Sequence, residues 1–107
     1  MDYMEVLRLL TINDEHCIID AGSAKLDPKT LALVRLGALI AVGGAVPSYG
    51  AEADVAVSAG ATAAEIVEVL LGGDSVVGRP SVVAAAPSLA MALGYVVNDA
   101  FEYQADW

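Results

Sequence analysis

Three polar residues lie close together in an otherwise apolar stretch, and they are the first candidates for chemistry. Ser48, Tyr49 and Glu52 follow Pro47, a residue typical of the first turn of a helix. The backbone N–H groups and the dipole of such a turn favour a bound anion. Glu52 would then act as a general base, with Ser48 or Tyr49 orienting a substrate carboxylate. In the structural alternative, Ser48 caps or solvates the turn, Tyr49 packs and Glu52 faces water.

Two arginines are further candidates for holding an anion. Arg35 interrupts the most apolar segment of the chain. It either binds a substrate carboxylate through a bidentate contact or forms a structural ion pair with Glu52 or another acid. We favour the structural pair, because a buried charge needs a partner whatever its use. Arg79, between Gly78 and Pro80, is either an anion contact or a loop charge.

No metal, redox or nucleotide motif is recognisable in the sequence. Cys17 is the only cysteine and His16 the only histidine, which excludes an intrachain disulfide, a CxxC pair and a tetrahedral zinc site made by one chain. The pairs Gly43-Gly44 and Gly72-Gly73 lack phosphate-loop spacing, so we interpret them as helix ends. We therefore expect no cofactor and no metal, and a surface position for His16.

Charge and hydrophobicity narrow the possible partners. The 14 acidic and 5 basic residues give a net charge of -9, which argues against binding nucleic acid or an anionic membrane surface. The run from Leu36 to Val46 is apolar or glycine throughout, but a membrane span needs about 20 residues. No basic, then apolar, secretion signal is visible at the start. With a lone cysteine, this pattern leads us to expect a cytoplasmic protein.

The proportion of apolar residues predicts self-association. At 107 residues the chain is the size of one domain, and 57% of its residues are hydrophobic while 18% are charged. A domain of this size keeps a large share of its surface exposed and cannot bury all of these side chains alone. We therefore expect a homo-oligomer.

Start and end signals divide the chain into helices. Asp27 before Pro28 is a strong helix start, and Thr62 with Glu65 forms a capping box. The expected helices cover residues 2–10, 28–42, 47 to the stop at Gly60, 62 to the stop at Gly72-Gly73, and 80–93. A short helix near residues 17–19 and a final helix or tail over 94–107 are also possible. The fold class is therefore all-α, in a single domain.

Burial can be assigned to faces of these helices. The 28–42 helix has so few polar positions that we expect it to be buried on most sides. In the next helix Tyr49, Ala53, Ala56 and Val57 form the apolar stripe. Pro87 should kink or divide the last helix, because proline removes a backbone donor and clashes with the preceding turn.

The central stretch resembles the carboxymuconolactone decarboxylase family, which includes the alkyl hydroperoxidase D-like proteins. Gly78 with Pro80 and the alanine-rich segment after it are also similar to the family's last core element. The resemblance covers about residues 26 to 93 and rests on LDPKT at 26–30, LVRL at 33–36, GGAVP at 43–47, AGAT at 59–62 and EIVEVL at 65–70.

The resemblance implies a helical domain assembled into trimers or hexamers, with its site at the junction before Pro47. Redox members carry a Cys-x-x-Cys pair and a histidine there; the matching positions here are Ala45, Ser48 and Glu52. The family's glutamate on the preceding helix also has no counterpart. We therefore expect no thiol peroxidase chemistry. Two hypotheses remain: proton transfer by Glu52 on a small carboxylated or lactone-like molecule held by Arg35, or a noncatalytic oligomeric binding or scaffold protein.

Overall fold

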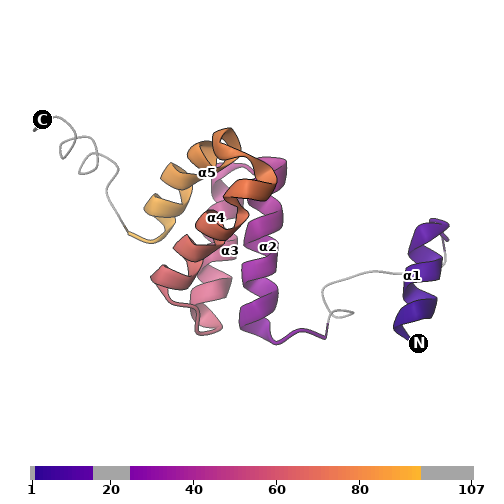
Figure 1. Cartoon of the computed structure of the whole chain (residues 1–107). Coiled ribbons are helices and arrows are strands. Elements are labelled where there is room, and N and C mark those ends of the chain that lie inside the picture. The colour runs from indigo at the N-terminus through magenta and orange to yellow at the C-terminus, as the bar shows by residue number, and fades with distance from the viewer. Residues whose placement is uncertain (1, 16–24, 95–107) are drawn as a thin grey trace, which may run out of the picture.

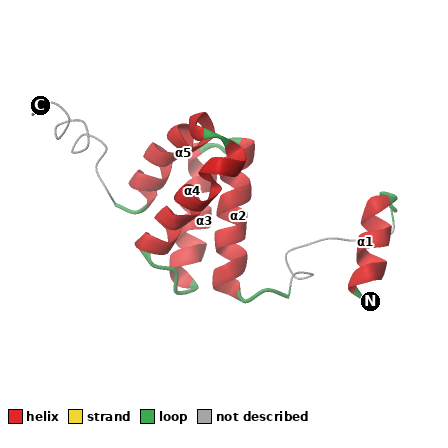
Figure 2. Cartoon of the chain, in the orientation of Figure 1, coloured by secondary structure: helices red, strands yellow, loops and turns green. Residues whose placement is uncertain are grey.

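The computed structural model describes residues 2–15 and 25–94, and within these ranges it contains helices and no strands (Figures 1 and 2). This confirms the all-α class. The predictions for His16, Cys17, residues 17–19 and residues 95–107 lie outside the described residues. The helices are α1 (Tyr3–Thr11), α2 (Pro28–Val42), α3 (Val46–Ser58), α4 (Ala63–Val77) and α5 (Arg79–Ala92).

Local capping sets the start of α2 and α4, as the sequence predicts. The Asp27 carboxylate accepts a hydrogen bond from the Thr30 N–H at 3.0 Å, and proline occupies the first turn. At α4 the Thr62 hydroxyl accepts from the Glu65 N–H, and the Glu65 carboxylate accepts from the Thr62 N–H, both at 3.0 Å. Each cap satisfies N–H groups that the helix itself leaves unpaired.

The turn between α2 and α3 requires glycine. Gly43 ends α2 with a left-handed φ of 76°, a conformation that side chains with a Cβ adopt at a cost. At Gly44 a Cβ would collide with the Leu39 side chain. The main chain can therefore reverse direction close to the end of α2, which places α3 beside it (Figure 1).

Four helices, α2 to α5, form the core. α2 packs mainly against α3 and α4, and α5 packs mainly against the same two helices. Alanine is frequent among the buried residues, so the helices approach closely with few large side chains between them. In the described ranges no polar or charged residue is fully buried. The buried set is Ala32, Leu36, Ile40, Tyr49, Ala53, Ala56, Ala61, Ile66, Leu70, Ala85 and Leu89.

The predicted end of α4 was wrong, and one of the two alternatives for Pro87, division of α5, is excluded. α4 does not end at Gly72-Gly73 but continues to Val77, and Gly78 ends it with a φ of 91°. A glycine inside a helix costs only about 1 kcal/mol relative to alanine, and Val77 on the added turn packs against the core. Pro87 lies inside α5 but does not divide it.

The assignment of faces on α3 also needs correction. Tyr49, Ala53 and Ala56 are buried as predicted, but Val57 is 52% exposed. Glu52 lies at the edge of the buried stripe rather than in solvent, because it is three residues after Tyr49 and four before Ala56. The alternative in which Glu52 faces water is therefore not the arrangement observed, because its side chain is partly enclosed.

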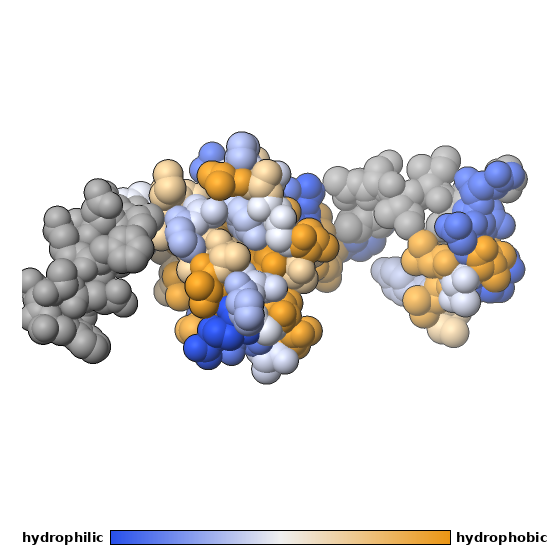
Figure 3. All heavy atoms as spheres, turned by 90° about the horizontal axis from the view of Figure 1, so that it is seen from above, coloured by the Kyte–Doolittle hydropathy of each residue, from blue (hydrophilic) through white to orange (hydrophobic). Residues whose placement is uncertain are grey.

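α2 is less buried than predicted. Its buried stripe consists of Ala32, Leu36 and Ile40, while its outer side is exposed in the single chain. Exposed hydrophobic residues also occur on the other helices of the core and on α1 (Figure 3). None of the described helices is both long and apolar enough to span a membrane.

Candidate functional site

The two charged residues proposed for chemistry, Arg35 on α2 and Glu52 on α3, lie against each other. The Arg35 Nη2 donates to the Glu52 Oε1 at 2.8 Å. The arginine side chain is 49% exposed and the glutamate side chain 19%. The other carboxylate oxygen, Oε2, is enclosed and has no hydrogen-bond partner in the structure. The favoured interpretation of Arg35, a structural pair with Glu52, is therefore the arrangement observed.

Tyr49 joins α3 to the end of α2. Its ring is buried, and its hydroxyl donates to the Leu39 carbonyl at 3.3 Å. The same carbonyl accepts the N–H groups of Gly43 and Gly44 at 2.9 and 3.1 Å. The Tyr49 hydroxyl therefore takes part in ending α2, and the ring forms one wall of a hollow on the surface of the domain.

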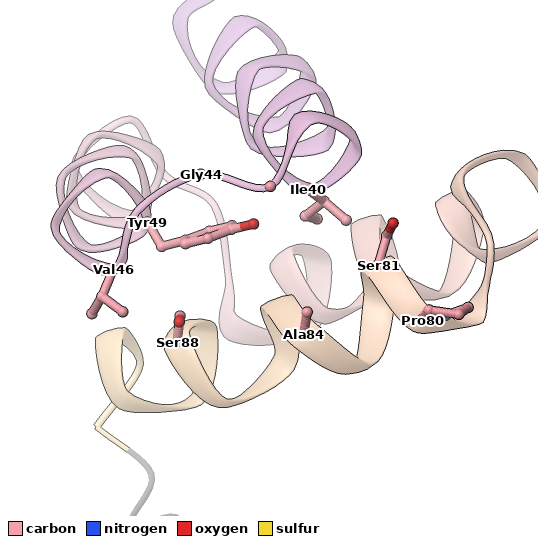
Figure 4. Close-up of a pocket in the computed structure, with 9 residues that line it drawn as sticks. Ile40, Gly44, Val46, Tyr49, Pro80, Ser81, Ala84 and Ser88 are labelled. Atoms are coloured by element: carbon pink, nitrogen blue, oxygen red, sulfur yellow. The ribbon is translucent and has the colours of Figure 1, made fainter.

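This hollow of about 430 Å³, which we call the Tyr49 hollow, lies between α5, the C-terminal end of α2 and the first turn of α3. Ser81, Ala84 and Ser88 project from α5 on the side that faces Tyr49 and Ile40 (Figure 4). No Asp, Glu, Lys, Arg or His lines it; its lining is Ile40, Gly43, Gly44, Val46, Tyr49, Pro80, Ser81, Ala84 and Ser88.

Two helix starts border the Tyr49 hollow. Val46 lies in the first turn of α3, and Pro80 and Ser81 lie in the first turn of α5. Neither helix has a side-chain hydrogen bond at its N-cap. Each of these first turns contains a proline, which has no N–H to donate, so few first-turn N–H groups remain for water or a ligand.

Ser48 and Arg79 lie outside the lining of this hollow. Ser48 is exposed on the first turn of α3, where its N–H donates to the Ala45 carbonyl. Arg79 begins α5 and donates to both oxygens of Asp74, Nε to Oδ1 at 2.7 Å and Nη2 to Oδ2 at 3.2 Å. These hydrogen bonds hold the pKa of Asp74 below its ordinary value, and the carboxylate raises the pKa of Arg79.

The structure thus brings together one pair of the proposed site residues and separates the others. Arg35 and Glu52 meet, Tyr49 lines the hollow, and Ser48 and Arg79 lie elsewhere. Among the described residues no group of three His, Cys, Asp or Glu side chains could hold a metal ion.

Sequence reasoning missed the two serines of the hollow. Ser81 and Ser88 are seven residues apart, so they fall on the same side of one helix two turns apart. That spacing was visible in the sequence. It acquires meaning only with the knowledge that this side of α5 faces the turn between α2 and α3, which a pattern within one helix does not reveal.

Comparison with known proteins gives one match, to a protein family. The model of the carboxymuconolactone decarboxylase family matches residues 5–90. The match begins well before residue 26, where the recognisable motifs start, and so takes in α1. Searches of curated proteins and of solved structures gave no match. A match over this much of the chain, on an all-helical domain with the expected caps, shows that the protein belongs to the carboxymuconolactone decarboxylase family.

Proposed function

We propose that this protein is a noncatalytic binding member of its family, which assembles as a homo-oligomer and holds a small organic molecule in the Tyr49 hollow. One observation carries the proposal. Arg35 and Glu52, the groups expected to bind an anion and move a proton, are bound to each other and do not line the hollow. The Tyr49 hollow therefore lacks the charged groups that proton transfer would use.

The lining indicates the chemistry of the ligand. The side chains of Ile40, Val46 and Ala84 suit an apolar body, and a hollow of about 430 Å³ is within the usual range for small-molecule sites. Ser81 and Ser88 supply hydroxyl groups that can donate hydrogen bonds. A small lactone or organic acid satisfies both requirements, since its acceptor oxygen would meet these donors.

Self-association is supported by the exposed apolar surface. Large hydrophobic side chains on every helix of the described core remain open to solvent in the single chain, among them Val42 at 79% and Val76 at 84%. Exposed apolar side chains in such numbers are typical of subunit interfaces. We propose a trimer or hexamer, as the resemblance implies, in the reducing cytoplasm that a lone cysteine suits.

A thermal-shift assay tests binding. Wild-type protein is melted with a panel of small lactones and carboxylic acids, beside Ala84→Phe, which fills the hollow, and Val83→Phe, a matched control on an exposed neighbour outside its lining. A ligand at about 100 times its Kd adds about 2.7 kcal/mol of stability. We expect that stabilisation in the wild type and the control, and its loss in Ala84→Phe. Equal stabilisation of all three proteins, or of none, contradicts the proposal.

Proton transfer by Glu52 is the second candidate, and the enclosed Oε2 favours it. A carboxylate oxygen that is shielded from water and lacks a partner is a plausible general base. NMR time courses with each stabilising ligand separate the two functions. Turnover by the wild type that disappears in Glu52→Gln, without a lower Tm, supports the enzyme. Binding without turnover supports the binding protein.

A further inference from the structure

α1 is an amphipathic helix without a partner in its own chain. Its apolar stripe carries Tyr3, Leu7 and Leu10 at helical spacing, and these side chains are 75%, 56% and 46% exposed. α1 makes no contact with α2 to α5 and lies apart from them (Figure 1). Figure 3 shows its hydrophobic atoms gathered as a band beside hydrophilic ones. A stripe of this kind is typical of a helix that packs on another surface.

The length of α1 strengthens this argument. Nine residues are fewer than the roughly 12 to 15 below which an isolated helix is marginal in water. The Asp2 cap and the ion pair of Glu5 with Arg8 add little, because exposed interactions of this type are weak. The family match also includes residue 5 onward, so α1 is part of the family's domain. We therefore infer that α1 is stabilised by packing against another surface.

The outer side of α2 has the complementary properties. Val34, Ala38, Ala41 and Val42 are exposed along the second half of the helix, although α2 is apolar on nearly every side. A helix that is hydrophobic all round is normally buried all round. The two alanines in the middle leave room for the close approach of another helix.

Charge also favours this pairing. Residues 2–15 contain four acids and one arginine, whereas α2 contains Lys29 and Arg35 and no acid. Both are paired within the chain, Arg35 with Glu52 and Lys29 with Glu65, but their side chains remain 49% and 39% exposed. Because each copy carries a net charge of -9, two copies associate most favourably through surfaces that do not place acids against acids. An acidic N-terminal segment against a basic, apolar helix meets that condition.

We propose that α1 of one copy packs its apolar stripe against the outer side of α2 of a second copy. The proposal rests on the self-association argued above and specifies the contact that produces it. The occupant is a second copy because the described residues show no contact of α1 with α2 to α5 of its own chain, and because the acidic N-terminal segment suits the basic outer side of α2.

Native mass spectrometry of matched variants tests the contact. Leu7→Asp places a carboxylate in the stripe, and the control Leu9→Asp places it roughly 200° around the same helix. Val34→Asp alters the receiving surface, and Ala51→Asp is its control on an exposed site of α3. We expect Leu7→Asp and Val34→Asp to weaken self-association about a hundredfold, because an unpaired charge is costly in an apolar contact. Circular dichroism checks that the core remains folded.

A mixing experiment separates this contact from others. Leu7→Asp has an altered α1 but an intact α2 surface, and Val34→Asp has the reverse. In a mixed pair, the intact α1 of the Val34→Asp copy can therefore pack on the intact α2 of the Leu7→Asp copy. We expect mixed oligomers to exceed either variant's own oligomers. An oligomeric wild type that Leu7→Asp leaves unchanged overturns the α1 contact while self-association stands. A monomeric wild type overturns both, and ligand binding in the Tyr49 hollow is then judged by its own assay.

Discussion

Removing Arg35 should destabilise the domain more than removing Glu52, although the two form one ion pair. Glu52 is 19% exposed, its Oε2 has no partner, and its Oε1 is bound to Arg35. Arg35→Met therefore leaves a largely enclosed carboxylate without a hydrogen bond in the structure. Leaving such a group unsatisfied costs about 1–3 kcal/mol. In a domain of this size, 1 kcal/mol corresponds to about 4–8 °C in Tm, so we expect a drop of about 10 °C.

The reverse change should be mild. Glu52→Leu removes the enclosed carboxylate, and the half-exposed Arg35 can turn to water, so the expected cost is about 0–1 kcal/mol. The double variant should recover most of the stability lost in Arg35→Met, because neither charge then remains enclosed.

Urea denaturation followed by circular dichroism measures the four free energies of unfolding. The slope against urea must stay constant for the comparison to hold, and two protein concentrations reveal any contribution from association. Equal costs for the two single variants, or a larger cost for Glu52→Leu, would refute the reasoning. Such a result would mean that the hydrogen bond from Arg35 does not offset the free-energy cost of enclosing the Glu52 carboxylate.

Three further outcomes follow from the packing and the caps. Leu36→Ala should cost about 2–5 kcal/mol in urea denaturation, because Leu36 is fully buried, and a cost below about 1 kcal/mol would place it outside the core. Thr62→Ala should lower the stability of the core by about 1 kcal/mol by removing the cap of α4, whereas Thr11→Ala on the separate α1 should not. The hydrogen bond from the Thr62 N–H holds the pKa of Glu65 below its ordinary 4.5. Likewise, the hydrogen bond from Arg79 holds the pKa of Asp74 below its ordinary 3.8. Their stabilisation is therefore complete at neutral pH and is lost as the pH falls through the lowered values, so Tm should be flat down to about pH 5 and then fall, less steeply in the Glu65→Gln variant.

Most of the fold followed from signals that act over four residues or fewer. The start of α2 at Pro28, its end at Gly43 and the reciprocal cap of Thr62 and Glu65 were all visible in the sequence. The two caps join a side chain to a backbone group of the same turn, and Gly43 ends α2 through its own left-handed φ, so no distant contact is needed to specify them. The spacing of Tyr49, Ala53 and Ala56 similarly identified the buried side of α3.

The errors arose where distant packing competes with a local preference. Gly72 and Gly73 weaken a helix, but the following turn brings Val77 against the core, and α4 continues. Pro87 removes one donor from α5, yet Ala85 and Leu89 on either side are both buried and the helix is not divided. Neither outcome could be read from one helix alone, because the competing free energy comes from other helices.

For the candidate site, the sequence by itself determined the residue types and their order. It supplied Arg35 and Glu52 as the central charges, and it places Ala45, Ser48 and Glu52 where the resemblance implies the cysteines and histidine of redox members. Tertiary structure decided which groups face one another: Arg35 binds Glu52, Arg79 binds Asp74, and Ser81 and Ser88 face Tyr49 across the hollow. The physical reason is that a side chain's partner depends on how helices are rotated and paired. Those contacts join residues far apart in the chain, and the pattern within any one helix carries no record of them.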